Sequence, residues 1–90
     1  MLYTANMTKG YIPQLSDNSP IKGEVYKHYK GDLYEIVGLA IHSNDDMWMV
    51  VYKPLYENAD AEMFTLPLNE WNKEVDWEGK RTKRFALEGR

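Results

Sequence analysis

The 90-residue sequence contains no cysteine, and this removes several kinds of site. Without thiols there is no disulfide framework, no thiolate nucleophile and no cysteine-based zinc site. Only two histidines are present, His28 and His42, and their spacing matches no zinc signature. One hypothesis is a metal site in which the two histidines are joined by Glu35 or Asp45. We interpret each histidine as bonded to a protein partner, and we predict no metal and no cofactor.

Long hydrophobic runs are also missing. No stretch approaches the roughly 20 apolar residues of a membrane span. The first residues, MLYTAN, lack the basic region and apolar core of a secretory signal. The absence of cysteine fits a reducing compartment. We therefore expect a soluble, cytoplasmic protein without membrane contact, whose length allows one small core.

Positive charge is in deficit, since the formal net charge is −3. This balance argues against a protein that coats extended nucleic acid, although a basic run at 80–84 leaves a local anion contact open. Catalytic patterns are absent as well. No serine lies in a Gly-x-Ser-x-Gly elbow, and the acidic pair Asp45-Asp46 falls in a polar turn where solvation explains it. The sequence predicts a protein that is not an enzyme.

Tyrosine, tryptophan and β-branched residues are plentiful, and they favour strands. No segment has a helical period over three turns. Strands are expected over 24–30, 33–42, 47–53, 62–66, 74–77 and 80–85, separated by turn residues such as Gly31-Asp32 and Glu78-Gly79. Strict alternation would put Tyr34 and His42 on one face of the second strand, and Gly38 marks a bulge, a bend or a close backbone approach. Residues 68–71 are expected to form one helical turn with Trp71 as a plug, and residues 87–90 to fray.

Short strands with frequent turns predict an all-β fold, a small SH3-like β-barrel over residues 23–90, with an OB-like barrel as the alternative. Residues 1–22 contain too many turn residues for a regular element. We interpret them as an extended N-terminal arm with one short strand near 10–13. The arm is expected to cover a sheet edge of its own domain or of a neighbour, so it is also a candidate contact for a homo-oligomer.

The segment YKHYKG at 26–31, followed by LYEIVGLAIHS at 33–43, resembles a family of small domains of unknown function from bacteria and phages. The usual sequence motif in that family is YxHYKGxxYxVLGxAxHSET. The resemblance continues through 50–56 and Pro67-Leu68 and covers residues 23–86. Two departures stand out: Asn44-Asp45 replaces the family's Glu-Thr, and Leu66 stands where an arginine is common. The resemblance implies a compact β-barrel and brings no established catalytic residues.

The same motif gathers aromatic and cationic side chains, and this pattern is typical of small β-barrels that hold nucleotides or single strands. We predict a non-enzymatic binding domain for a nucleotide-like or other small anionic ligand. Tyr26, His28 and Tyr34 would form an aromatic wall, with Lys30 as the anion contact. Further candidate ligand-binding residues are Tyr29, His42, Tyr52 and Arg84. The structural alternative makes the tyrosines core or barrel-rim residues.

A protein-interaction or self-association module is the rival function. SH3-like barrels bind extended peptides in aromatic grooves. The residues that would supply such a groove are Trp48, Tyr52, Tyr56 and Trp71.

Overall fold

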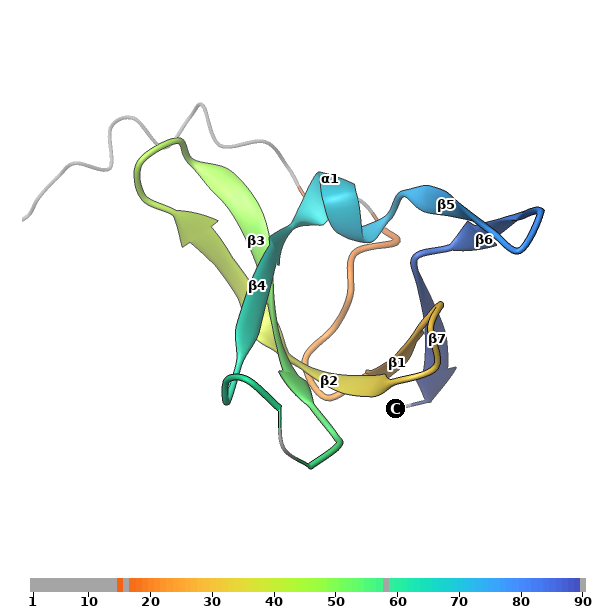
Figure 1. The fold of residues 1–90 in the computed structure, drawn as a ribbon. Coiled ribbons are helices and arrows are strands. Elements are labelled where there is room, and N and C mark those ends of the chain that lie inside the picture. Colours follow the sequence, from red (N-terminus) through yellow and green to blue (C-terminus); the bar gives the residue numbers. More distant parts are fainter. Residues whose placement is uncertain (1–14, 16, 58, 90) are drawn as a thin grey trace, which may run out of the picture.

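The computed structural model describes residues 15, 17–57 and 59–89, and it is mostly β (Figure 1). The elements in chain order are β1 (Val25–His28), β2 (Leu33–His42), β3 (Met47–Pro54), β4 (Phe64–Pro67), α1 (Leu68–Trp71), β5 (Glu74–Trp77), β6 (Lys80–Lys83) and β7 (Phe85–Gly89). The predicted all-β class and the single helical turn are confirmed. No helix among the described residues is long and apolar enough to cross a membrane.

The strands form two antiparallel sheets. The larger has the order β4-β3-β2-β1-β7, and the smaller is the β5-β6 hairpin. In Figure 1 the larger sheet curves beneath α1, while the β5-β6 hairpin projects to one side. Strands β4 and β7 are the two edges of the larger sheet, and no pairing joins them within the described residues. Hydrogen bonding between strands therefore does not close this sheet into the barrel that the sequence led us to expect.

Turn residues end the strands where the sequence indicated. Gly31, between β1 and β2, has a φ of +113°, in a region that side-chain-bearing residues rarely adopt. Glu78 and Gly79, between β5 and β6, have φ values of +53° and +82°. Positive φ at both central positions is what a type I′ hairpin turn requires, and its twist matches that of the strands it connects.

A bulge interrupts β2 at its middle. Ile36 pairs with Tyr52 and Gly38 with Val51, so one extra residue lies on β2 between these pairs. Of the alternatives given for Gly38, a bulge, a bend or a close backbone approach, the structure has a bulge, but the prediction that one face continues from Tyr34 to His42 is wrong. The extra residue reverses the alternation, so Leu39 beyond the bulge packs against the core as Tyr34 does before it.

The core lies between the curved sheet and α1. Its buried apolar residues are Ile36, Val50, Trp71 and Phe85. Trp71 is only 2% exposed, and its ring is stacked on Phe85 with centroids 3.7 Å apart and planes 2° apart. Pro67 precedes α1, and the single turn directs Trp71 inward. The prediction that Trp71 plugs the fold is confirmed.

The C-terminal end departs from the prediction. The expected strand 80–85 is divided at Arg84 into β6 and β7, and β7 pairs with β1 as far as Gly89. The prediction that residues 87–90 fray is therefore wrong for 87–89. Residues 85–89 form a strand because they pair with β1. No local pattern in the sequence predicts such a long-range contact.

The predicted N-terminal arm is described only at Leu15 and at 17–22, so its expected strand near 10–13 and its coverage of a sheet edge lie outside the described residues. Pro20 is buried against the domain. Just beyond the arm, the Gly23 N–H donates to the Ile36 carbonyl over 2.9 Å, and the Ile36 N–H donates to the Glu24 carbonyl over 2.9 Å. These two bonds lead the chain directly into β1.

Candidate functional site

A tight turn between β1 and β2 forms the centre of the candidate site. The His28 N–H donates to the Asp32 carbonyl over 2.8 Å, and the Gly31 N–H donates back to the His28 carbonyl over 2.7 Å. The Lys30 N–H donates to His28 Nδ1 over 3.1 Å. Because Nδ1 accepts this bond, His28 is a neutral imidazole with its proton on Nε2. The turn sets Tyr29 and Lys30 beside this ring.

Tyr29 connects the turn to the small sheet. Its ring lies 4.3 Å from that of His28 and 5.1 Å from that of Trp77, the last residue of β5. The ammonium of Lys30 is 5.9 Å from the centre of the Tyr29 ring, within the range of a cation–π contact. Trp77 is 36% exposed. Two aromatic rings and a cation therefore meet at the surface.

Arg84 completes this group from the bend between β6 and β7. Its carbonyl accepts from the Tyr29 N–H over 3.1 Å, and its own N–H donates to the Lys73 carbonyl over 3.1 Å. Its guanidinium Nη1 donates to Glu70 Oε1 over 3.4 Å. Arg84 Nε is buried and has no hydrogen-bond partner in the part of the chain that the structure describes. We call His28, Tyr29, Lys30, Trp77 and Arg84 the basic–aromatic corner.

The charges at the corner act on its histidine. Burial lowers the pKa of His28 below its usual 6.5, and the nearby positive charges of Arg84 and Lys30 lower it further, while Asp32 acts in the opposite direction. The carboxylate of Glu70 partly neutralises the positive charge of Arg84. The pKa of Glu70 is itself lowered, chiefly by its hydrogen bond from Lys73, and Arg84 adds to this. Near neutral pH the corner therefore offers two cations and an uncharged imidazole.

The other predicted tyrosines lie against the core. The Tyr52 ring is 4.9 Å from Trp71 and 5.2 Å from Tyr34, and the Tyr26 ring is 5.4 Å from Trp71. Burial raises the pKa of Tyr34, and a hydrogen bond between its hydroxyl and that of Tyr56, 3.1 Å away, adds to this. The pKa of Tyr52 is raised by burial too. Tyr26, Tyr34 and Tyr52 therefore pack against the core and the rings around it. This is the placement given by the alternative in which the tyrosines are core or rim residues.

His42 does not join the group. It pairs with Met47 at the far end of β2, eight residues beyond Tyr34, and this is up to about 26 Å along a strand. Its Nδ1 lies 3.4 Å from Asp45 Oδ1. The alternative of a metal site shared by His28 and His42 is therefore wrong. Across residues 15, 17–57 and 59–89, no three potential ligands from histidine, aspartate or glutamate gather around a common point.

Trp77 belongs to the corner but was missing from the residues predicted for the site. Its position at the end of a predicted strand, just before Glu78-Gly79, was visible in the sequence. A large aromatic residue beside a hairpin turn has little core to enter, and that is the signal that could have identified it.

The comparisons with known proteins identify the family. The family described as "Protein of unknown function (DUF1653)" matches residues 24–87. The chain belongs to the DUF1653 family. A crystal structure of a DUF1653 protein from Bordetella bronchiseptica is similar, with 42% sequence identity, a TM-score of 0.71, and coverage of 77% of this chain and 88% of that chain. No curated protein matches the chain.

The DUF1653 match agrees with the resemblance drawn from the sequence over 23–86, and membership in a family of unknown function is confirmed. The exact sequence of the family motif stays a prediction. All residues of the basic–aromatic corner lie within the matched segment of this DUF1653 domain.

Proposed function

We propose that this DUF1653 domain is a non-enzymatic binding domain that holds a nucleotide-like or other small anionic ligand at the basic–aromatic corner. One observation carries the proposal. The rings of Tyr29 and Trp77 lie 5.1 Å apart at the surface, with the Lys30 ammonium 5.9 Å from the Tyr29 ring. The planes of the two rings are 70° apart, so a planar base can stack on one ring and meet the other at its edge while a phosphate takes the nearby cation.

Each residue has a distinct role in this proposal. Either Tyr29 or Trp77 supplies the stacking face while the other ring contacts the edge of the base, and Lys30 supplies the anion contact. Arg84 adds positive charge from a side chain that is 31% exposed. His28 stays neutral and supports the Tyr29 ring from behind. Tyr26, Tyr34 and Tyr52 support the corner through the core, and His42 has no role in it. The net charge of −3 favours a small ligand over extended nucleic acid.

The proposal also includes an SH3-like topology and a cytoplasmic protein of bacterial or phage type. The curved five-stranded sheet and the single helical turn beneath which it bends support the topology (Figure 1). The absence of cysteine supports a reducing compartment. Self-association through residues 1–22 remains a separate proposal, resting on the composition of that segment.

A protein-interaction surface is the second candidate, and one observation favours it. Leu33, Leu55 and Tyr56 are 38%, 46% and 38% exposed, and the Leu55 N–H donates to the Leu33 carbonyl over 2.9 Å. These side chains form an apolar patch at one end of the sheet. The groove expected from the sequence would have to include Trp71, which is only 2% exposed, so this patch replaces it.

Ligand titration of the purified chain tests the primary proposal. The panel contains mononucleotides, cyclic dinucleotides and short single strands, and binding is followed by the melting temperature and by calorimetry. A ligand at 100 times its dissociation constant adds about 2.7 kcal/mol to the free energy of unfolding. In a domain of this size such a gain raises the melting temperature by about 10–20 °C.

Two variants localise the binding. Lys30→Met keeps the aliphatic stem and removes the charge, and Trp77→Ala removes one of the two rings that contact the base. Lys27→Met is the matched control, because Lys27 is exposed on β1 and makes no ion pair with a described residue. We expect the first two variants to bind the ligand about tenfold more weakly than the wild type, and we expect the control to bind it as tightly as the wild type. A panel without binders contradicts the proposal, and a melting temperature that rises with protein concentration favours the apolar patch.

A further inference from the structure

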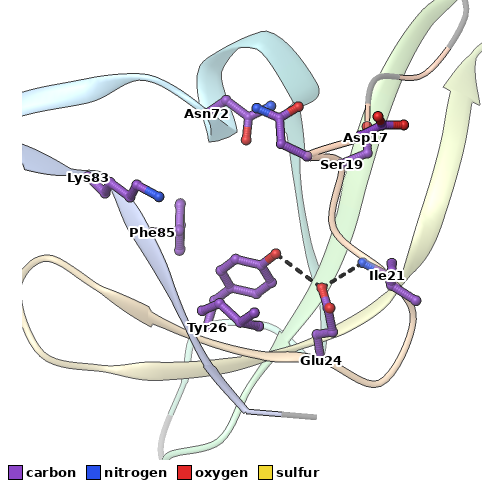
Figure 2. A pocket seen from close by; sticks show the side chains of 10 residues that line it. Asp17, Ser19, Ile21, Glu24, Tyr26, Asn72, Lys83 and Phe85 are labelled. Atoms are coloured by element: carbon purple, nitrogen blue, oxygen red, sulfur yellow. Dashed lines mark hydrogen bonds between the residues drawn. The ribbon is translucent and has the colours of Figure 1, made fainter.

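A recess lies apart from the basic–aromatic corner. It has a volume of about 310 Å³, and none of the corner residues lines it (Figure 2). Its walls come from the segment 17–24, from β1, from Asn72 just after α1, and from β6 and β7. A cavity of this size is in the range that holds small molecules.

One wall carries a buried carboxylate. Glu24 is 5% exposed, and its Oε1 accepts from the Tyr26 hydroxyl over 3.1 Å and from the Ile21 N–H over 2.9 Å. Figure 2 shows both bonds converging on this oxygen. A buried charge is unfavourable unless hydrogen bonds or an opposite charge compensate it. These bonds orient a negative group at the edge of the recess before any ligand arrives.

The opposite side carries a positive group. Figure 2 shows Lys83 across the recess from Asp17 and Glu24, with Phe85 and Tyr26 between them. Neither Lys83 nor Asp17 forms an ion pair with another described residue. The recess therefore has separated walls of opposite charge.

The remaining lining is partly apolar and partly polar. Phe85 is 6% exposed and is held by its stack on Trp71, whereas Ile21 and Leu87 are 60% and 45% exposed at the rim. Ser19 Oγ is buried and has no hydrogen-bond partner among the residues that the structure describes. A rigid aromatic floor, two apolar rim residues and an unpaired hydroxyl suit a ligand with both polar ends and an apolar body.

We propose that this recess binds a small zwitterion with an apolar side chain, namely a free amino acid or a dipeptide. Its ammonium group faces Glu24 and Asp17, its carboxylate faces Lys83, and its side chain packs against Phe85 and Leu87. A simple anion would meet the two carboxylates, and a simple cation would leave Lys83 without a partner. Only a ligand with both charges complements both walls.

Calorimetric or NMR titration of the full chain tests this. The probes are L-phenylalanine, L-leucine and leucyl-leucine, each compared with its amide and its N-acetyl derivative. We expect the zwitterions to bind and each derivative to bind about tenfold more weakly, because each loses one charged contact. An amide that binds as tightly as the zwitterion, or no binding by any probe at concentrations up to about 10 mM, overturns the proposal.

Three lysine variants place the binding in the recess. Lys83→Met removes the positive wall and keeps the stem, while Lys80→Met is the matched control on the same strand, outside the recess. We expect Lys83→Met to bind the zwitterions about tenfold more weakly than the wild type. Lys80→Met and the corner variant Lys30→Met should bind them as tightly as the wild type. Equal effects of Lys83→Met and Lys80→Met overturn the proposal. Loss of nucleotide binding in Lys30→Met with intact zwitterion binding separates this site from the corner.

Discussion

Truncating Trp71 to alanine should remove a large part of the stability of this domain. Trp71 is 2% exposed, and an aromatic side chain of this kind buries about 150–250 Å². At about 25 cal/mol per Å², the lost burial corresponds to roughly 4–6 kcal/mol, an upper bound because unfolded chains already bury some surface. Large-to-small changes of buried aromatic residues cost about 3–5 kcal/mol. A domain of this size has a total stability of about 5–13 kcal/mol.

The geometry of the stack makes the expectation specific. Trp71 lies face to face with Phe85 at 3.7 Å and meets the Tyr52 and Tyr26 rings edge-on at 4.9 and 5.4 Å. Alanine leaves a cavity between three rings that belong to different strands. The sheet cannot fill this cavity without giving up its pairing, so little relaxation is expected. The melting temperature should fall by about 15–30 °C.

Trp71→Phe provides an internal check. The indole Nε1 is buried without a hydrogen-bond partner among the described residues. A buried unpaired donor costs about 1–3 kcal/mol, and phenylalanine removes this donor while keeping the stack on Phe85. The gain offsets part of the lost burial, so this variant should lie within about 2 kcal/mol of the wild type.

Urea unfolding followed by far-UV circular dichroism measures both variants. Trp77→Ala is the control, because Trp77 is 36% exposed and contacts only one described ring, that of Tyr29. It should cost less than about 1.5 kcal/mol. The reasoning is refuted if Trp71→Ala is no more destabilising than Trp77→Ala. It is also refuted if Trp71→Phe is as damaging as Trp71→Ala, since the stack on Phe85 that phenylalanine keeps would then make no measurable contribution.

Two further predictions concern the β1-β2 turn. Gly31→Ala should destabilise the domain by about 1–2 kcal/mol, because the φ of Gly31 is +113°, whereas Gly38→Ala should be nearly neutral, because its φ is ordinary and a Cβ there meets nothing within 4 Å. Equal effects of the two in urea unfolding would contradict this. The lowered pKa of His28 predicts that its contribution to stability is complete above pH 6.5 and is lost as the pH falls through the folded-state pKa. The difference in melting temperature between the wild type and His28→Gln should therefore change between about pH 7.5 and 5, and a constant difference would argue against it.

Local chemistry was enough to predict much of this protein from its sequence. Glycine at a positive φ ends β1, Glu78-Gly79 closes the β5-β6 hairpin, and β-branched and aromatic runs become strands. The plug at Trp71 follows Pro67 by four residues, a distance that one helical turn spans. Each of these features depends on the conformational preferences of neighbouring residues, and the sequence displays them directly.

Long-range contacts decided the rest. The segment 85–89 is a strand because β1 pairs with it, and nothing within the segment specifies this. The bulge in β2 was visible at Gly38, but only the pairing with β3 shows that it returns Leu39 to the face of Tyr34 and separates His42 from the other candidates. A shift of one residue reverses every following side chain, so a face predicted from alternation fails beyond the bulge.

The candidate site divides in the same way. The motif at 26–31 contains Tyr29 and Lys30 in the sequence itself, and the DUF1653 match includes it. Folding adds Trp77 and Arg84 from segments some fifty residues later and turns Tyr26, Tyr34 and Tyr52 toward the core. The recess depends wholly on the tertiary structure, since Asp17 and Lys83 line the same space only when the N-terminal segment and β6 enclose it. The physical reason is that local preferences choose the conformation of each segment, whereas packing and pairing choose its neighbours.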